Sequence, residues 1–441
     1  VTVDFYLINE KNVRGNHQLK ISVTDSQGKV MEVGTYETEA AGGEVYGQLL
    51  VKDVKIPVPT AGGLCRIEAK LCKENSVVTT GYDDILSVNL ASNMLDGKGA
   101  VWEDGSALQN FLKGKTKEAV AAYEDNLGKL DWIMVARPPR KDQLTMVPME
   151  ALRSADGKPG LDVVYYEDME FQKEVYHEVA KVVNLSAIEG ATPSPFVYML
   201  DGYGIKWSGK VLPSVSGEYT IIPQSNDRSM IEVFVNGKKI YEITRKKEHL
   251  GDGKVYLEGG KSADIEIRFR HPRSNARCRL DWAVPNDKMP DAQRLMERAV
   301  NDGTKIFIIQ SADEWSEFIA ANSKAVFKDK FFVGTNWLGG VMFNKPHDIF
   351  KELPVGNALN WPYQALIHTG VERMGLVMEG EELLVGAYHT YPMAIGTAMG
   401  IVPMGKGSVL FSTLDIYGNI INDSAAGLVA KKLIFNMIDF K

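Results

Sequence analysis

The feature that most restricts the fold of this chain is that its hydrophobic periodicity changes three times. Up to about residue 88 apolar and polar residues alternate with a period of two. From Lys98 short apolar runs alternate with helical patterns, the period of two returns from Leu161 to Pro285, and helical patterns resume after Pro290. A period of two indicates half-buried strands, whereas strand–helix–strand order is typical of a parallel sheet.

These patterns predict a multidomain α+β protein. Residues 1–92, with several short strands and no helix, are expected to form an immunoglobulin-like β-sandwich. Residues 98–150 and 288–441 are expected to form one flavodoxin-like α/β domain, interrupted by a β domain at 158–287. The apolar runs Leu130–Ala136, Lys305–Ile309 and Ser408–Leu414 are its expected strands, and its expected helices are Lys115–Leu127, Ala292–Asn301 and Ser424–Phe440.

Charge and composition exclude some partners. The chain has 50 Lys plus Arg against 57 Asp plus Glu, a net charge of −7, so we expect no nucleic-acid partner, because phosphate binding needs a concentrated basic face. The short basic cluster Arg245-Lys246-Lys247 is interpreted as a solvated loop. No apolar run is long enough for a membrane span. Because Val1 already lies in a strand pattern, with neither Met nor a signal peptide before it, we expect a part of a longer protein.

The interrupting β domain resembles the carbohydrate-binding domain first named for anthrax protective antigen. The segments that carry the resemblance, in the order of that family, are Leu161–Phe171, Ile205–Lys210, Val215–Thr220, Ser225–Ser229, Val233–Lys238 and Arg279–Trp282. Members that bind sugar through calcium have adjacent Asp residues where this chain has Asn226-Asp227. The resemblance therefore implies a metal site at Asp227 and Asn226, weakened by the carboxamide, and no cofactor other than calcium.

The resemblance and the residue types together predict a glycan-binding site. Sugar rings stack on aromatic side chains, and their hydroxyl groups need planar polar partners. Tyr203, Trp207, Asn226, Asp227 and Asn236 supply both kinds. The alternatives are that Trp207, with Trp282, fills the core of the sandwich and that Asn236-Gly237 only makes a type I′ hairpin.

The remaining parts resemble the region that follows the catalytic barrel in glycoside hydrolase family 2 enzymes. Phe5–Glu10, Gly15 and Asp25–Lys29 resemble the β-sandwich after the barrel. The α/β part resembles a class I glutamine amidotransferase-like module through Asn344–Pro354, Asn360–Gln364, Gly405–Asp415 and Lys432–Asn436. This implies the non-catalytic C-terminal region of a secreted or periplasmic, β-galactosidase-like enzyme, whose partners are a glycan and an upstream barrel of the same polypeptide.

We expect no catalytic residue in this chain. Asn9-Glu10 matches the acid/base dipeptide of the hydrolase family, but it lies before a hairpin and not at the end of a barrel strand, so we interpret Glu10 as a surface residue. The α/β part has no Cys for an amidotransferase. Ser311 follows an apolar strand, and Ser311-Ala312-Asp313-Glu314 is interpreted as a helix capping box.

A second site is conceivable at the sheet edge of the α/β part. Trp337, Trp361 and His389 could line a pocket at the carboxyl ends of its strands, where open α/β sheets bind ligands; the alternative is that they are core or loop residues. Two other functions stay open: a free-standing glycan-binding or adhesion protein, and a hydrolase that uses this pocket through Ser311 or His389.

Overall fold

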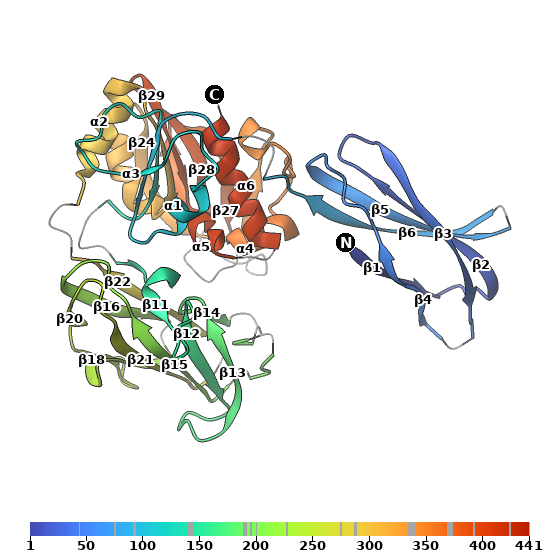
Figure 1. Cartoon of the computed structure of the whole chain (residues 1–441), viewed down its shortest axis with the longest axis horizontal. Coiled ribbons are helices and arrows are strands. Elements are labelled where there is room, and N and C mark those ends of the chain that lie inside the picture. Colours follow the sequence, from blue (N-terminus) through green and yellow to red (C-terminus); the bar gives the residue numbers. More distant parts are fainter. Residues whose placement is uncertain are drawn as a thin grey trace.

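The computed structural model describes residues 1–43, 45–74, 76–90, 94–139, 144–187, 192–194, 196–199, 201–225, 228–273, 276–285, 289–333, 340–367, 374–390, 393–422 and 425–440. Figure 1 shows three groups of sheets: the blue N-terminal strands, the α/β part, and the green strands that interrupt the α/β part in sequence. Among the described residues, no helix is long and apolar enough to cross a membrane.

The N-terminal part is formed by strands only. One sheet pairs β1 (Thr2–Ile8) with β4 (Gly47–Lys55), and a second has the order β3-β2-β5-β6. The strands of this second sheet are β2 (Gly15–Thr24), β3 (Val30–Ala40), β5 (Gly63–Lys73) and β6 (Ser76–Ser87). Leu19, Ile21 and Val23 of β2 are buried while the residues between them are more exposed, as the period of two predicts.

The α/β part is built on one sheet of ten strands. Its order is β24-β26-β28-β29-β23-β9-β7-β8, with β27 and β25 beyond β28. Strands β7 (Gly99–Glu103), β8 (Ala121–Ala122), β9 (Trp132–Ala136), β23 (Lys305–Gln310) and β29 (Gly407–Ser412) pair in parallel. The others pair antiparallel: β24 (Val326–Phe332), β25 (Val341–Asn344), β26 (Met374–Glu379), β27 (Glu382–His389) and β28 (Ala394–Met404). The sheet is therefore mixed.

Helices cover both faces of the parallel strands. Trp132 and Met134 of β9 share a core with α1 (Ala107–Leu112), α5 (Ile416–Ile420) and α6 (Ala425–Asp439). Ile133 and Val135 share another core with α2 (Ala292–Asp302) and α3 (Ala312–Ala321). Short helical segments occur at η1 (Met149–Ala151), η3 (Asp348–Phe350), η4 (Trp361–Tyr363) and α4 (Gln364–Ile367). Helix α2 begins at Ala292 as expected and ends one residue beyond the expected Asn301, where Gly303 adopts a left-handed φ of 80° at the C-cap.

The expected helix Lys115–Leu127 is wrong. Helix α1 ends at Leu112, Gly114 takes a φ of 74°, and the chain then runs along the edge of the sheet. Ala121 and Ala122 pair in parallel with Ala100 and Val101 of β7. Pairing with a strand edge thus outweighs the helix propensity of this charged segment.

The interrupting β part has two sheets packed around one core. One has the order β10-β22-β16-β20, with β14 on β22; the other has the order β13-β12-β15-β21-β17-β18-β19, with β11 on β15. The first comprises β10 (Thr145–Met146), β14 (Asn184–Ala187), β16 (Gly217–Ser225), β20 (Lys254–Leu257) and β22 (Ala276–Ala283). The second comprises β11 (Leu152–Arg153), β12 (Leu161–Tyr166), β13 (Glu174–Ala180), β15 (Tyr203–Val211), β17 (Met230–Val235), β18 (Lys238–Ile243), β19 (His249–Leu250) and β21 (Ala263–His271).

Candidate functional sites

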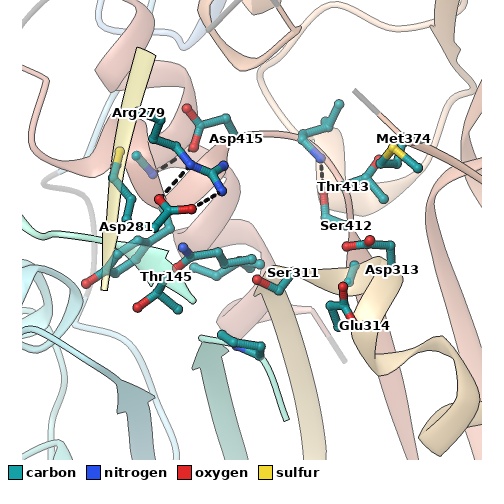
Figure 2. A pocket seen from close by; sticks show the side chains of 18 of the residues that line it. Thr145, Arg279, Asp281, Ser311, Asp313, Glu314, Met374, Ser412, Thr413 and Asp415 are labelled. Atoms are coloured by element: carbon teal, nitrogen blue, oxygen red, sulfur yellow. Dashed lines mark hydrogen bonds and ion pairs between the residues drawn. The ribbon is translucent and has the colours of Figure 1, made fainter. Parts of the chain in front are cut away.

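A cavity of 430 Å³ lies where the parallel strands of the α/β sheet end and the β part begins. Residues that follow β23 and β29 line one side of it, and residues of β10, β16 and β22 line the other (Figure 2). We call it the junction cavity. Its lining is Pro138, Leu144–Met146, Gln224, Arg279, Asp281, Ile309–Glu314, Leu366, Met374, Ser412–Asp415, Tyr417 and Gly418. This is the edge at which open α/β sheets bind ligands.

Ser311 lies in the junction cavity in a strained conformation. It connects β23 to α3 with φ 54° and ψ 34°, a left-handed conformation that non-glycine residues seldom adopt. Its side chain makes no capping hydrogen bond, so the predicted capping box is wrong; the Glu314 N–H donates to the Ser311 carbonyl oxygen instead, at 3.0 Å. The neighbouring Gln310 has a buried Oε1 atom with no hydrogen-bond partner in the described part of the chain. Strained residues often mark functional sites.

The described lining of the junction cavity does not contain the histidine base that usually activates a serine nucleophile. No histidine is among the described residues that line it, and a serine hydroxyl requires an adjacent base to attack. The carboxylates of Asp281, Asp313 and Asp415, in the described lining, are engaged in structural contacts. Arg279 donates to both oxygens of Asp281 at 2.7 and 2.6 Å (Figure 2). Lys330 Nζ lies 2.7 Å from Asp313, and Asp415 accepts the Gly418 N–H at 3.0 Å. The arrangement can bind a polar ligand, and the described residues of its lining present no serine–histidine pair.

Buried charges hold the two sides of this junction together. Arg137, after β9, pairs with Asp104, after β7, at 2.5 Å, and both side chains are almost fully buried. The Thr145 hydroxyl of β10 donates to the other oxygen of Asp104 at 2.7 Å. Since Thr145 pairs with Trp282 of β22, this contact links the α/β sheet to the β part.

A second buried carboxylate supports α1 and α5. Glu103 accepts the N–H groups of Leu108 and Gln109 at 3.0 and 2.9 Å and the Tyr417 hydroxyl at 2.8 Å. Burial raises the pKa of Glu103 above its ordinary value, although these hydrogen bonds partly offset the effect.

The predicted sugar-stacking aromatic residues are in the core. Tyr203 is 1% exposed and Trp207 is 3% exposed, and each ring packs against Phe269 of β21. A sugar cannot reach either face. The expectation that the two rings contact glycan is therefore corrected: for Trp207 the core alternative is right, and Trp282, 1% exposed, fills the same core.

The predicted polar residues of the glycan site have different outcomes. Asn236 and Gly237 have φ values of 48° and 74° in the turn between β17 and β18, and Asn236 Oδ1 accepts the Asp264 N–H at 2.9 Å. Asn236 thus shapes a hairpin, as its alternative held. Asn226 and Asp227, and with them the predicted calcium site, lie outside the described residues. Within the described residues, no group of three or more His, Cys, Asp or Glu could hold a metal ion.

The predicted aromatic pocket of the α/β part is not brought together at the junction cavity. Trp361, in η4, is 50% exposed, and His389 is the last residue of β27; neither lines that cavity. Trp337 lies outside the described residues.

A second cavity, of 680 Å³, lies at the surface of the β part, and sequence reasoning missed it. Its lining is Met169, Glu170, Arg228, Met230, Arg245, Lys247, Arg270 and Pro272. We call it the basic cavity. Two sequence features pointed to this cavity: the basic cluster at residues 245–247 and the position of Arg228 directly after Asn226-Asp227. Only the fold brings these segments to one place.

Asp168 fixes one wall of the basic cavity. Its carboxylate accepts the N–H groups of Glu170, Gln172 and Lys173 at 2.6 to 3.2 Å, which holds the loop containing Met169 and Glu170. Loss of solvation alone would raise the pKa of Asp168, but these hydrogen bonds outweigh it and keep the pKa below its usual value. The wall is therefore supported by a charged carboxylate at neutral pH.

Comparison with known proteins identifies the β part. Residues 157–294 match the PA14 domain family. The anti-sigma-I factor RsgI3 of Acetivibrio thermocellus is 28% identical over 127 residues, which are 28% of this chain and 19% of that protein. The chain thus spans about a fifth of this curated relative.

Similar solved structures cover parts of the chain. A β-glucosidase from Kluyveromyces marxianus in complex with glucose has 12% identity and a TM-score of 0.32, over 49% of this chain and 28% of that chain. The epithelial adhesin 9 A domain of Candida glabrata in complex with Galb1-4GlcNAc has 11% identity and a TM-score of 0.25, over 32% and 90% of the two chains. The PA14 domain of the antifreeze protein MpAFP has 11% identity and a TM-score of 0.23, over 30% and 87%. From the family match, residues 157–294 of this chain are a PA14 domain.

Proposed function

We propose that this chain is the glycan-binding and scaffolding region of a secreted or periplasmic, β-galactosidase-like glycoside hydrolase. The observation that carries the proposal is the PA14 domain at residues 157–294, a family with carbohydrate-binding members. In this proposal the immunoglobulin-like N-terminal sandwich and the flavodoxin-like α/β part position the PA14 domain beside an upstream catalytic barrel. Calcium at Asn226 and Asp227 is part of the proposal.

The position of the basic cavity supports glycan binding at the surface of the PA14 domain. Arg228, in its lining, follows Asn226-Asp227 in sequence, the dipeptide that aligns with the sugar-binding loop of the family. Met169, Met230 and Pro272 give it apolar surface for the C–H face of a sugar, and charged side chains surround that surface. Ligand sites usually combine apolar lining with a few placed polar groups.

A glycan array probed with the whole purified chain, with calcium and with a chelator, tests the proposal. We expect binding to a subset of glycans, weakened by the chelator, and no turnover of aryl galactosides. Absence of binding to every glycan under both conditions would refute glycan recognition. Mass spectrometry of the native polypeptide in its source cells separates the two kinds of parent protein: a barrel in the same polypeptide supports the hydrolase, and its absence supports a free-standing adhesion protein.

The strained Ser311 favours one competing function, a hydrolase that uses the junction cavity. A fluorophosphonate probe tests it directly, because the probe labels only an activated serine. We expect no labelling of Ser311, since the described lining offers no histidine base. Labelling that is abolished by Ser311→Ala would establish the hydrolase and overturn the non-catalytic proposal.

A further inference from the structure

The basic cavity gathers positive charge from three separate segments of the PA14 domain. Arg228 precedes β17, Arg245 and Lys247 lie between β18 and β19, and Arg270 is near the end of β21. Glu170 is the one carboxylate among the described residues of the lining. Among the described lining residues there are thus four cations and one anion, in a chain whose net charge is −7.

Arg270 is held in place by its neighbours. Its Nε donates to the Met169 carbonyl oxygen at 3.1 Å, and its Nη1 donates to Glu232 at 2.8 Å. Its guanidinium also lies 4.7 Å from the centre of the Phe171 ring. Because these contacts fix the side chain before any ligand arrives, Arg270 can contribute to binding with little further loss of conformational entropy.

Arg228 and Arg245 have no such engagement. Both are exposed, and within the described part of the chain neither forms an ion pair with a carboxylate. Grouping cations at one place on a solvated surface is unfavourable by itself, because like charges repel. Convergence of this kind favours a ligand that carries negative charge.

We infer that the basic cavity of the PA14 domain selects acidic glycans, whose sugar rings carry carboxylate or sulfate groups. The inference rests on the proposed glycan binding and adds the class of glycan. Apolar contacts from Met169, Met230 and Pro272 would meet the C–H faces of the sugar, and the arginines would pair with its anionic oxygens. Arg245 and Lys247 of the cluster Arg245-Lys246-Lys247 are then part of a binding surface instead of a solvated loop.

Calorimetry on the whole chain tests the inference with three matched probes: an oligogalacturonate, the same oligosaccharide with its carboxyl groups reduced to alcohols, and a sulfated galactan oligosaccharide. We expect at least one acidic probe to bind about tenfold or more tightly than the neutral probe. That advantage should shrink as salt rises, because salt screens exposed charges. The oligogalacturonate and the sulfated galactan together show which anionic group is preferred.

Charge-reversal variants locate the binding surface. Arg245→Glu and Arg228→Glu should each weaken binding of the acidic probe about tenfold and leave the neutral probe within about twofold. Lys246→Glu is the matched control, because Lys246 is exposed in the same loop and makes the same charge change but does not line the cavity. We expect it to lower affinity less than about threefold. An equal loss with Lys246→Glu would overturn the cavity as the site.

The outcomes separate the inference from the proposed function. Equal affinity for neutral and acidic probes would overturn the inference and leave glycan binding standing. Tighter binding of a DNA oligomer than of any glycan probe would overturn the inference in favour of nucleic acid. Failure of every glycan on the array would overturn the proposed function itself.

Discussion

Removing the Asp104 carboxylate should destabilise the junction between the α/β sheet and the PA14 domain. Asp104 and Arg137 form an ion pair of 2.5 Å, with side chains 9% and 5% exposed. In an Asp104→Ala variant the guanidinium would stay charged and buried, since arginine does not lose its proton in proteins. The variant would also take away the acceptor of the Thr145 hydroxyl.

The expected cost follows from this burial. Breaking a buried pair by removing one partner typically costs about 3–5 kcal/mol, whereas replacing both partners with apolar residues of similar size is often close to neutral. Burial lowers the pKa of Arg137, and the Asp104 charge offsets only part of that effect, so an unpaired guanidinium is unfavourable here. We therefore expect Asp104→Ala to lose about 3–5 kcal/mol, and the double variant Asp104→Leu/Arg137→Met to recover most of it.

Tryptophan fluorescence during urea unfolding can report this loss locally. The Arg137 guanidinium lies 5.5 Å from the Trp102 ring, and the Trp315 indole N–H donates to the Arg137 carbonyl oxygen at 2.7 Å. The chain has several domains that can unfold separately, so the unfolding transition seen by Trp102 and Trp315 is the one to compare between variants. A single-variant loss under about 1 kcal/mol, or a double variant no more stable than the single, would refute the reasoning.

Three further predictions concern single side chains. Trp207→Ala should leave a cavity in the core and lower the free energy of unfolding of the PA14 domain by about 3–5 kcal/mol, with the glycan affinity of the folded protein unchanged. Urea unfolding measures the stability and calorimetry measures the affinity. Loss of affinity at unchanged stability would show that Trp207 is a binding residue after all. Ser311→Gly should raise stability by up to about 1 kcal/mol and Ser311→Val should lower it, because only glycine adopts a φ of 54° without strain. The melting temperature should therefore be highest for the Gly variant and lowest for the Val variant. The reverse order would contradict the inference that Ser311 is strained. Burial raises the pKa of the Glu103 carboxyl in the folded protein, so the stabilisation by Glu103 is complete below about pH 4.3 and is lost as the pH rises through that raised pKa. The variant Glu103→Gln should therefore flatten the dependence of unfolding free energy on pH in this range. An unchanged slope between about pH 4 and 7 would contradict the prediction.

Sequence reasoning succeeded where one segment determines its own structure. The strands β9, β23 and β29 are apolar runs that are largely buried on both faces, and helix α2 begins at Ala292 as predicted and ends one residue beyond the predicted Asn301. Such elements need no information from the rest of the chain. The segment 115–127 differs, because its state depends on the unpaired edge of β7.

The binding residues could not be predicted in this way, since exposure is a property of the assembled fold. Tyr203 and Trp207 have the chemistry of sugar contacts but lie on the buried face of β15. Conversely, Arg245 looked like an ordinary solvated cation. It becomes part of a cavity only because β17, β18 and β21 are neighbours in one sheet, which brings the segments around Arg228 and Arg270 beside it.

The junction cavity and the basic cavity have linings of opposite charge, and this decides which of them an acidic ligand can use. The junction cavity has four carboxylates in its lining, from Asp281, Asp313, Glu314 and Asp415, and Arg279 is the one cation among the described residues there. An acidic glycan would be repelled from it and attracted to the basic cavity. A neutral ligand is not sorted by charge and could enter either. Affinity that depends on Arg245 and falls with salt would therefore assign an acidic ligand to the PA14 surface. Affinity that responds to neither would point to the junction cavity, where Gln310 Oε1 has no hydrogen-bond partner among the described residues.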